Sequence, residues 1–143
     1  MSLKQVTVFV ENKQGALVAI TDTLAAHNVN MRALSIADTE DFGILRLIVS
    51  DTDTACATLT EQGYLLKVTD VVGVKISDEP GKLSQALQVL DEAHINMEYL
   101  YAFMLRTEKH AYVVLRVADN EAAEAALTAA GFHLISDADV CKL

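Results

Sequence analysis

Each half of the chain contains a short polar turn whose residues are suited to holding a small charged molecule. In each turn an Asn or Asp lies three residues before a Gly, and another Asn lies fifteen residues after that Gly: Asn12, Gly15 and Asn30, then Asp78, Gly81 and Asn96. A helical pattern of apolar residues starts just after each Gly, and the free N–H groups at a helix start favour a carboxylate. A free amino acid offers that carboxylate, together with an ammonium group for nearby oxygens. The simpler alternative is that these residues only shape turns and strand starts, as Asn and Asp commonly do.

The turns recur because the chain contains an internal repeat. At an offset of 66 residues, identical residues pair up as Val6/Val72, Val8/Val74, Gly15/Gly81, Leu17/Leu83, Leu24/Leu90, Asn30/Asn96, Met31/Met97 and Leu34/Leu100. The match continues at an offset of 68 with Leu47/Leu115, Val49/Val117, Asp51/Asp119, Leu59/Leu127, Gly63/Gly131 and Leu66/Leu134. The change of two residues falls between Ile36 and Ile44, where a turn can absorb it.

Each copy predicts the order strand, helix, strand, strand, helix, strand. Apolar residues alternate in the first segment, recur at helical spacing in the second, and occupy both faces of two central strands. Asp51 and Asp119 mark the start of the second helix, which stops before a Gly. Hairpins at residues 38–42 and 106–110 join the central strands. The predicted strands are residues 6–10, 30–37, 44–49 and 64–70 in the first copy and 72–76, 96–105, 111–117 and 132–135 in the second.

This order predicts an α+β protein of two tandem ferredoxin-like βαββαβ domains, residues 1–70 and 71–143, each an antiparallel sheet with its helices on one face. The start of the second strand can lie near the first turn, so Asn12 and Asn30 are expected to reach one ligand. The bare sheet face carries apolar residues such as Tyr101 and Phe103 and should be covered by the other copy or a second chain, giving at least a homodimer. No Gly/Ser-rich linker separates the copies at residues 69–72, which predicts rigidly held domains.

Composition argues against several classes of protein. The formal net charge of −9 disfavours nucleic acid, because affinity for phosphates depends on Lys and Arg. There is no signal-peptide pattern, and the longest apolar run, residues 99–105, is far shorter than the roughly 20 residues that span a membrane. Cys56 and Cys141 stand apart from metal-ligand spacings. We expect reduced thiols, a cytoplasmic location, and no metal or cofactor.

The turns and their surroundings resemble tandem ACT-domain proteins, small stand-alone relatives of the regulatory domains attached to enzymes of amino-acid metabolism. The resemblance covers residues 3–143. The second copy carries the turn pattern in nearly full form at residues 78–83, Asp-Glu-Pro-Gly-Lys-Leu, followed by Ile-Asn-Met at residues 95–97. The first copy matches it at residues 12–17 and 29–31, but has Gln14 where the family usually has Pro. Its turn is therefore expected to be looser.

The resemblance implies that an effector amino acid lies between the first turn and the start of the second strand, commonly at an interface between ACT units. Carried over to this sequence, it implies a ligand-binding set of Asn12, Gly15, Ala16, Leu17, Asn30, Met31, Phe42, Asp78, Gly81, Lys82, Leu83, Asn96 and Met97. Residues 41–46 look like a segment of stand-alone tandem members, in which Phe42 either covers the ligand or packs at the end of a hairpin. Similar proteins make histidine or a branched-chain amino acid the first ligands to test.

The sequence thus predicts an amino-acid-binding regulatory module, coupled to a partner such as an enzyme of amino-acid metabolism or to its oligomeric state. Two alternatives stay open: a structural dimerisation subunit of such an enzyme, and a small hydrolase of ferredoxin-like fold. An acylphosphatase would need an Arg in the first turn, and residues 12–17 contain none. The histidines are expected at helix ends and turns rather than beside a nucleophile: His27, His94, His110 and His133. Asp38, Glu40 and Asp41 are expected to form a solvated hairpin.

Overall fold

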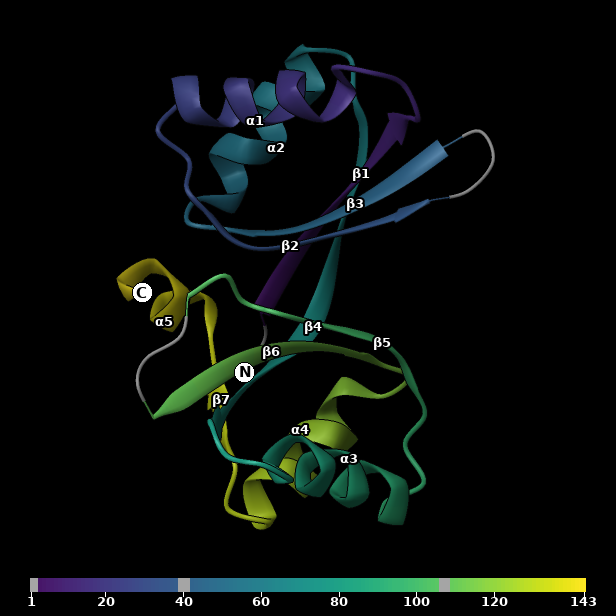
Figure 1. Ribbon diagram of the computed structural model, residues 1–143, viewed down its shortest axis with the longest axis vertical. Helices are drawn as coiled ribbons and strands as arrows, with labels where there is room; N and C mark the ends of the chain where they lie inside the picture. The colour runs from purple at the N-terminus through teal and green to yellow at the C-terminus, as the bar shows by residue number, and fades with distance from the viewer. Residues whose placement is uncertain (1–2, 39–41, 106–108) are drawn as a thin grey trace. The chain divides into compact units, whose positions relative to one another are not determined.

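The computed structural model describes residues 3–38, 42–105 and 109–143. Within these ranges the strands are β1 (Leu3–Glu11), β2 (Met31–Asp38), β3 (Phe42–Val49), β4 (Leu65–Ser77), β5 (Met97–Ala102), β6 (His110–Val117) and β7 (His133–Ile135) (Figure 1). The helices are α1 (Ala16–Ala26), α2 (Thr52–Glu61), α3 (Lys82–Glu92), α4 (Asn120–Ala129) and α5 (Asp137–Lys142). The α+β class and the two tandem βαββαβ units are as predicted.

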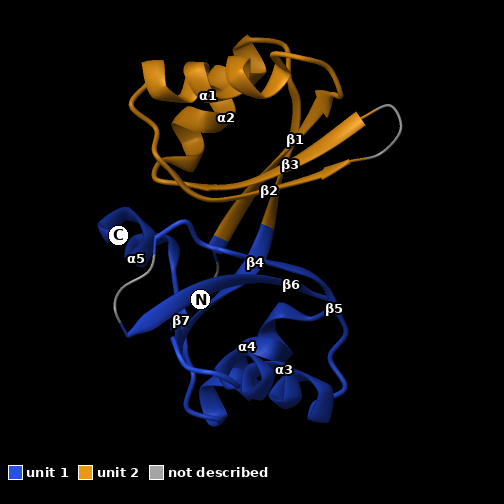
Figure 2. Ribbon diagram, in the orientation of Figure 1, with its two compact units in different colours: residues 1–3, 70–143 blue, residues 4–69 orange. Residues whose placement is uncertain are grey.

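The chain divides into two compact units (Figure 2). One comprises Lys4–Thr69, and the other comprises residues 70–143 together with Leu3. We call residues 4–69 the first repeat and residues 70–143 the second repeat. Strand β4 crosses the boundary without a break. The segment at residues 69–72, expected to join two strands, is thus the middle of a single strand.

The first repeat is built on a sheet with the strand order β2-β3-β1, and β4 is the strand next to β1. Helices α1 and α2 cover one face of this sheet (Figure 1). Val6, Val8 and Val10 alternate along β1 and belong to the core of the repeat. They form a core with Ile20 and Leu24, which lie one helical turn apart on α1. The spacing of these residues therefore fixes which face of β1 and which face of α1 meet. The turn between the two elements is held in place by this packing.

The second repeat repeats this plan with β4 at the centre of its sheet. Strand β4 pairs antiparallel with β6 on one side and with β7 on the other, and β6 pairs with β5. Val72 and Val74 of β4 face α3 and α4 and share a core with Leu90 and Leu127. Gly73 points the other way, and a Cβ there would overlap the side chain of Ile135.

The helix starts follow the predictions in part. Asp51 and Asp119 cap α2 and α4, each accepting a hydrogen bond from a backbone N–H three residues later. Helix α5 is absent from the sequence prediction, although its capping box, Ser136 with Asp139, is a recognisable start signal. The hairpin predictions, with Glu40 and Asp41, include residues 39–41 and 106–108, which lie outside the described residues.

Candidate functional site

The first helix of each repeat starts differently from the other helices. Gly15 and Gly81 precede α1 and α3 with φ of 86° and 87°, and neither helix has a side-chain cap. Helices α2, α4 and α5 each start from a residue whose side chain accepts a backbone N–H. A positive φ suits Gly because a Cβ is disfavoured there. Each helix therefore begins where expected, and its first N–H donates to a carbonyl of the turn: Ala16 to Lys13 and Lys82 to Glu79, both at 3.3 Å.

A cavity of about 300 Å³ lies beside the start of α1 in the first repeat. Three residues of the predicted ligand-binding set line it, Asn12, Ala16 and Leu17, together with the end of β2. The side-chain amide of Asn12 donates a hydrogen bond of 2.9 Å to Asp38 Oδ1. Ile36 adds an apolar wall. The site therefore combines a carboxylate, an amide and apolar surface at an uncapped helix start.

The structure does not bring Asn30 to this cavity, so the expectation that Asn12 and Asn30 of one unit reach the same ligand is wrong. Strands β1 and β2 both pair antiparallel with β3, and they therefore run in the same direction. Both strands therefore end at the same edge of the sheet, on either side of β3, and the start of β2 lies roughly 25 Å from that edge at about 3.3 Å per residue. The backbone of Asn30 is instead bonded to Ser50. Its carbonyl accepts the backbone N–H of Ser50 at 2.8 Å, and its own backbone N–H donates to Ser50 Oγ at 2.9 Å.

The second repeat shows the same separation. Asn96 lies next to the start of β5, where its carbonyl accepts the backbone N–H of Ala118 at 3.1 Å. Asp78 lies at the other end of the sheet, and its backbone N–H donates to the Lys109 carbonyl at 2.8 Å. The distance between the first turn and the start of the second strand is set by how the strands pair in the sheet. The number of residues between two positions in the sequence does not give this pairing.

Three other predicted residues pack toward the interior. Met31 is partly buried against the core of the first repeat, and Leu83 and Met97 are partly buried against the core of the second. Sequence reasoning missed Asp38 as a site residue and assigned it to a solvated hairpin. Its position at the end of the second strand was the available signal, since strands in the same direction end at the same edge.

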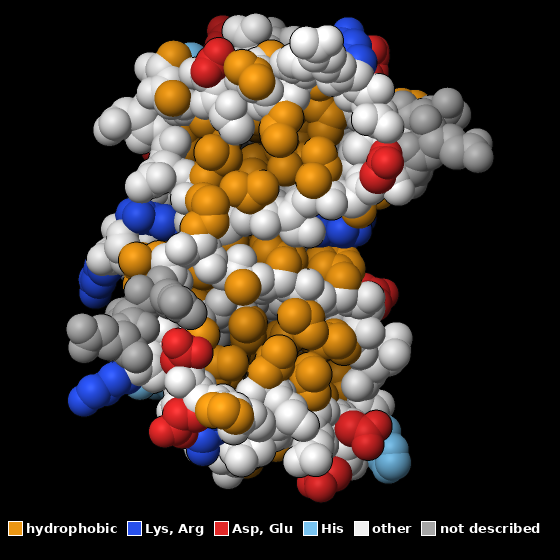
Figure 3. All heavy atoms as spheres, in the orientation of Figure 1, with side chains coloured by type: hydrophobic (Ala, Val, Ile, Leu, Met, Phe, Trp, Pro, Cys, Tyr) orange, Lys and Arg blue, Asp and Glu red, His pale blue; other side chains and the backbone are white. Residues whose placement is uncertain are grey.

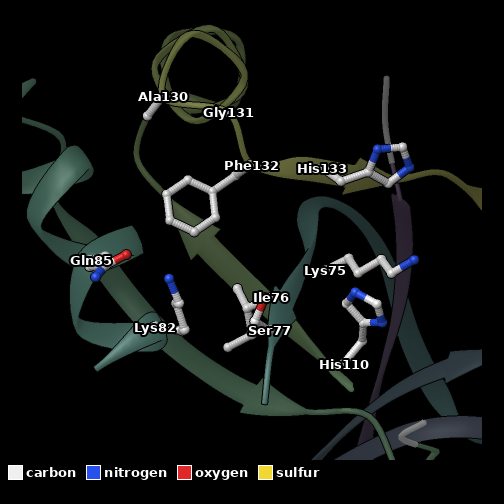
Figure 4. A pocket seen from close by; sticks show the side chains of 10 residues that line it. All are labelled: Lys75, Ile76, Ser77, Lys82, Gln85, His110, Ala130, Gly131, Phe132 and His133. Atoms are coloured by element: carbon white, nitrogen blue, oxygen red, sulfur yellow. The ribbon is translucent and has the colours of Figure 1, made fainter. Parts of the chain in front are cut away.

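Each repeat also contains a hollow at an equivalent place, which in the first repeat is separate from the 300 Å³ cavity. It lies where the first strand ends, the first helix begins and the last strand starts. In the first repeat it measures about 600 Å³, and its lining includes Phe9, Gly15, Ala16, Ala19, Phe42, Tyr64 and Leu65. In the second it measures about 450 Å³, and its lining includes Lys75, Ser77, Lys82, Gln85, His110, Phe132 and His133 (Figure 4). The predicted residues Phe42 and Lys82 thus lie in equivalent hollows of different chemistry.

Apolar side chains are exposed around the start of α1. Leu17, Val18 and Ile36 are 37%, 60% and 52% exposed. Figure 3 shows hydrophobic side chains gathered on the viewed face of each unit. Apolar surface of this kind is typical of sites that bind a ligand or another protein.

Among the described residues we looked for a metal site, a membrane-spanning helix and a reactive nucleophile, and found little support for any of them. They contain no group of three or more His, Cys, Asp or Glu that could hold a metal ion. Nor does any helix in that part of the chain have the length and apolar character to cross a membrane. His27 lies at the end of α1, with Nδ1 2.9 Å from the Thr23 carbonyl oxygen. Burial, and then the charge of Asp53, raise the pKa of the half-buried Cys56 thiol, which makes it a poor nucleophile.

Comparison with known proteins identifies the family. A family model described as an ACT domain pair matches residues 1–143. No curated protein matches the chain. The crystal structure of protein BT0572 from Bacteroides thetaiotaomicron is 37% identical, with a TM-score of 0.93, and the match covers 100% of this chain and 98% of that one.

Two further solved structures share the fold at low sequence identity. The ligand-free regulatory subunit of aspartate kinase from Thermus thermophilus is 17% identical, with a TM-score of 0.67 and 88% of each chain covered. The corresponding subunit from Thermus flavus is 17% identical, with a TM-score of 0.59 and 89% and 91% covered. With the family match over its whole length, the chain belongs to the ACT domain family and consists of an ACT domain pair.

Proposed function

We propose that this ACT pair is a regulatory module that binds a free amino acid beside the first turn of its first repeat. The observation that carries the proposal is the 300 Å³ cavity where Asn12, Ala16 and Leu17 meet the end of β2 at the uncapped start of α1. Its volume lies at the lower end of the range of about 300 to 1,000 Å³ for small-molecule sites. A single amino acid is a ligand of matching size.

The cavity offers a separate partner for each part of an amino acid. The start of α1 supplies N–H groups for the carboxylate. Asp38, held by Asn12, supplies an oxygen for the ammonium group. Val10, Leu17 and Ile36 supply an apolar wall. An aliphatic side chain suits this wall better than an imidazole, so we favour a branched-chain amino acid over histidine.

A second copy of the chain would complete the site. In the ACT family that the sequence resembles, the effector commonly lies between the first turn and the start of the second strand at an interface between units. Asn30 lies at the far end of the sheet from Asn12 in its own unit, so it would have to come from another. The exposed Leu17, Val18 and Ile36 give that second copy an apolar surface to cover. We therefore propose a homodimer.

Regulation would follow from the shared site. A ligand that contacts two units favours the arrangement in which both contacts are made, and the shift is limited to its differential affinity, typically about 1 to 3 kcal/mol. Two structures that share the fold are regulatory subunits of aspartate kinase. By analogy, the partner of this chain is an enzyme of amino-acid metabolism.

A thermal denaturation screen against the common amino acids tests the proposal. A ligand present at about 100 times its dissociation constant should add roughly 2.7 kcal/mol to the free energy of unfolding. We expect one or more branched-chain amino acids to raise the melting temperature and to change the dimer population in size-exclusion chromatography. A stable dimer with no response to any amino acid would contradict the proposal and favour the structural dimerisation subunit.

A further inference from the structure

Gly43 is the one glycine of the chain whose residue type the fold does not require. All six glycines lie within the described residues, and four of them have a positive φ, which favours Gly: Gly15, Gly63, Gly81 and Gly131. Gly73 is needed for packing, because a Cβ there would overlap Ile135. Gly43 has neither requirement. A Cβ at Gly43 would lie 3.6 Å or more from the nearest side chains, those of Ile36 and Val10, which is ordinary contact.

Gly43 also lies within a regular part of the sheet. It pairs with Val10 of β1 and with Asp38 of β2, and the register is unbroken at these positions. Glycine weakens a strand, and it often marks a bulge or a place where a ligand or another backbone comes close. The regular pairing argues against a bulge, and the nearest atoms to a Cβ belong to side chains. The close approach of a ligand is the explanation that fits.

The space that Gly43 leaves open belongs to the cavity of about 300 Å³ in the first repeat. Gly43, Val10 and Ile36 all line this cavity. The absent Cβ would lie 3.7 Å from Val10 Cγ2 and 3.6 Å from Ile36 Cδ1. We call the space between these two side chains, above the backbone of Gly43, the Gly43 notch. It gives the cavity an apolar recess whose floor is the β3 backbone.

The notch and the Asp38 carboxylate lie on the same face of the sheet. Strand β3 lies between β1 and β2 (Figure 1), and residues paired directly in antiparallel strands point to the same face. Val10, Gly43 and Asp38 therefore form a row across three strands. Val10 shares the core with Ile20 of α1, so the row lies on the face that α1 covers. A molecule at the start of α1 can reach both the carboxylate and the notch without crossing the sheet.

Asp38 is the acid better placed to hold an ammonium group. Among the described residues that line the cavity there are two acids, Glu11 and Asp38. Glu11 forms an ion pair with Lys13 at 3.1 Å, whereas Asp38 accepts a hydrogen bond from the neutral amide of Asn12. Neighbouring strands are about 4.8 Å apart, so an amino acid held at Asp38 has its side chain beside Gly43.

We propose that Gly43 determines which amino acid the first repeat accepts, and that the notch selects leucine or isoleucine over the shorter valine and alanine. The inference rests on the proposed amino-acid site. A side chain of four carbons fills the recess, whereas a shorter one leaves part of it empty. One methylene group in an apolar pocket changes affinity by roughly tenfold or more. A methyl group on residue 43 would occupy the space that the end of the ligand needs.

The second repeat lacks both the notch and the carboxylate, so we expect one ligand per chain. Ala111 stands in place of Gly43 and pairs with Ile76. Two residues beyond the last pair of β5 with β6, Met104 falls opposite Ala111, in place of Asp38. A methyl group and an apolar side chain thus replace the two features that define the site in the first repeat.

Calorimetric titration of the full chain with leucine, isoleucine, valine and alanine tests the proposal in the wild type and in Gly43→Ala. We expect the wild type to bind leucine or isoleucine roughly tenfold more tightly than valine, with one ligand per chain. Gly43→Ala should weaken binding of the larger ligand by roughly tenfold and that of alanine little, so the preference is lost.

The outcomes separate this proposal from the proposed function. If an amino acid binds but the wild type does not prefer leucine or isoleucine, or if Gly43→Ala keeps the wild-type order of affinities, Gly43 is not the determinant and the amino-acid site still stands. If no amino acid binds to the wild type, both proposals are wrong. Urea denaturation of the same samples shows whether Gly43→Ala is folded, which its ordinary contacts predict.

Ala111→Gly is the matched control for Gly43→Ala. It makes the reverse change at the equivalent position of the second repeat, and the affinities and the stoichiometry should stay at their wild-type values. A change in affinity as large as that in Gly43→Ala would show that binding responds to the sheet in general rather than to the notch. That result would overturn the proposal.

The wild-type protein provides a test that needs no variant. With leucine bound, nuclear Overhauser contacts should join the methyl groups of the ligand to the α protons of Gly43 and to the methyl groups of Val10 and Ile36. Contacts to Leu17 without any to Gly43 would place the side chain of the ligand outside the notch. That result, or the absence of contacts to all four residues, contradicts the proposal.

Discussion

The equivalent hollows of the two repeats have nearly the same backbone and different side chains. The glycines before the first helices have φ of 86° and 87°, and Gly63 and Gly131, which precede the last strands, both have φ of 89°. The side chains that line the hollow are largely apolar in the first repeat, whereas those in the second repeat include two lysines and two histidines. The difference in chemistry therefore comes from side chains placed on a common frame.

The comparison separates residues that build the fold from residues that are free to vary. Leu24 and Leu90 are identical and buried at equivalent core positions, as are Leu59 and Leu127. Around the hollow the residues change type without changing the element order.

Gly73→Ala should have the largest effect on stability. A Cβ at this position would overlap Ile135 and come within 2.8 Å of the Leu3 side chain. Overpacking of this kind costs about 1 to 3 kcal/mol, which urea denaturation would detect as a lower free energy of unfolding.

Gly43→Ala is the control for Gly73→Ala. A Cβ there would lie 3.6 Å from Ile36, an ordinary contact, and the equivalent residue of the second repeat is already Ala111. A similar loss of stability in both variants would show that steric overlap at Gly73 is not the cause.

Gly15→Ala and Gly81→Ala should destabilise the protein equally. A Cβ at either position meets no atom within 4 Å, so the cost comes only from the positive φ and amounts to about 1 to 2 kcal/mol. The measurement is again urea denaturation, with each variant compared with the wild type. Clearly unequal losses would show that the two turns are not equivalent, which would weaken the comparison of the hollows.

The sequence predicts most of the fold because local patterns encode it. The alternation at Val6 and Val8 and the turn at Gly15 are short-range signals. Because the chain contains an internal repeat, each of these signals occurs a second time in the other copy. Helix α5 escaped prediction because its six residues are too few to show a periodic pattern, although Ser136 and Asp139 mark its start.

The site was harder to predict than the fold. Asn12 and Asp38 are 26 residues apart in sequence, and only the shared direction of β1 and β2 brings them within a hydrogen bond. Because β1 and β2 run in the same direction, Asn30, which lies just before β2, is at the opposite end of the sheet from Asn12. The hollow of the second repeat likewise depends on the pairing of Lys75 with His133, which no single segment reveals.

Asn12→Ala should weaken amino-acid binding by roughly tenfold, since it removes the hydrogen bond that positions the Asp38 carboxylate. The expected effect on folding is small, because Asn12 is exposed. Calorimetric titration with the amino acid found in the thermal screen provides the measurement. Asp78→Ala, the equivalent change in the second repeat, should leave this affinity unchanged. Equal losses in both variants would mean that both first turns bind the ligand.

Thr54→Ala should have the smallest effect, visible mainly as a change in the pH dependence of stability. Thr54 Oγ1 donates a hydrogen bond of 2.6 Å to Asp51 Oδ2, and its backbone N–H donates to Oδ1 at 3.1 Å. The side-chain hydrogen bond, followed by the backbone one, lowers the pKa of Asp51. A lowered pKa contributes stability above the unfolded-state value of about 3.9, and this contribution is lost as the pH falls through the folded-state pKa.

Removing the hydroxyl should therefore reduce stability near neutral pH, and the difference from the wild type should vanish in acid. Ala has a higher helix propensity than Thr, so the change of this difference with pH, measured by urea denaturation, is the readout. Thr54→Ser keeps the hydroxyl and should follow the wild-type curve. The second repeat already has Ala122 at this position, where Asp119 receives the backbone N–H at 3.1 Å. If the difference between Thr54→Ala and the wild type does not depend on pH, the hydroxyl is not what stabilises the Asp51 carboxylate.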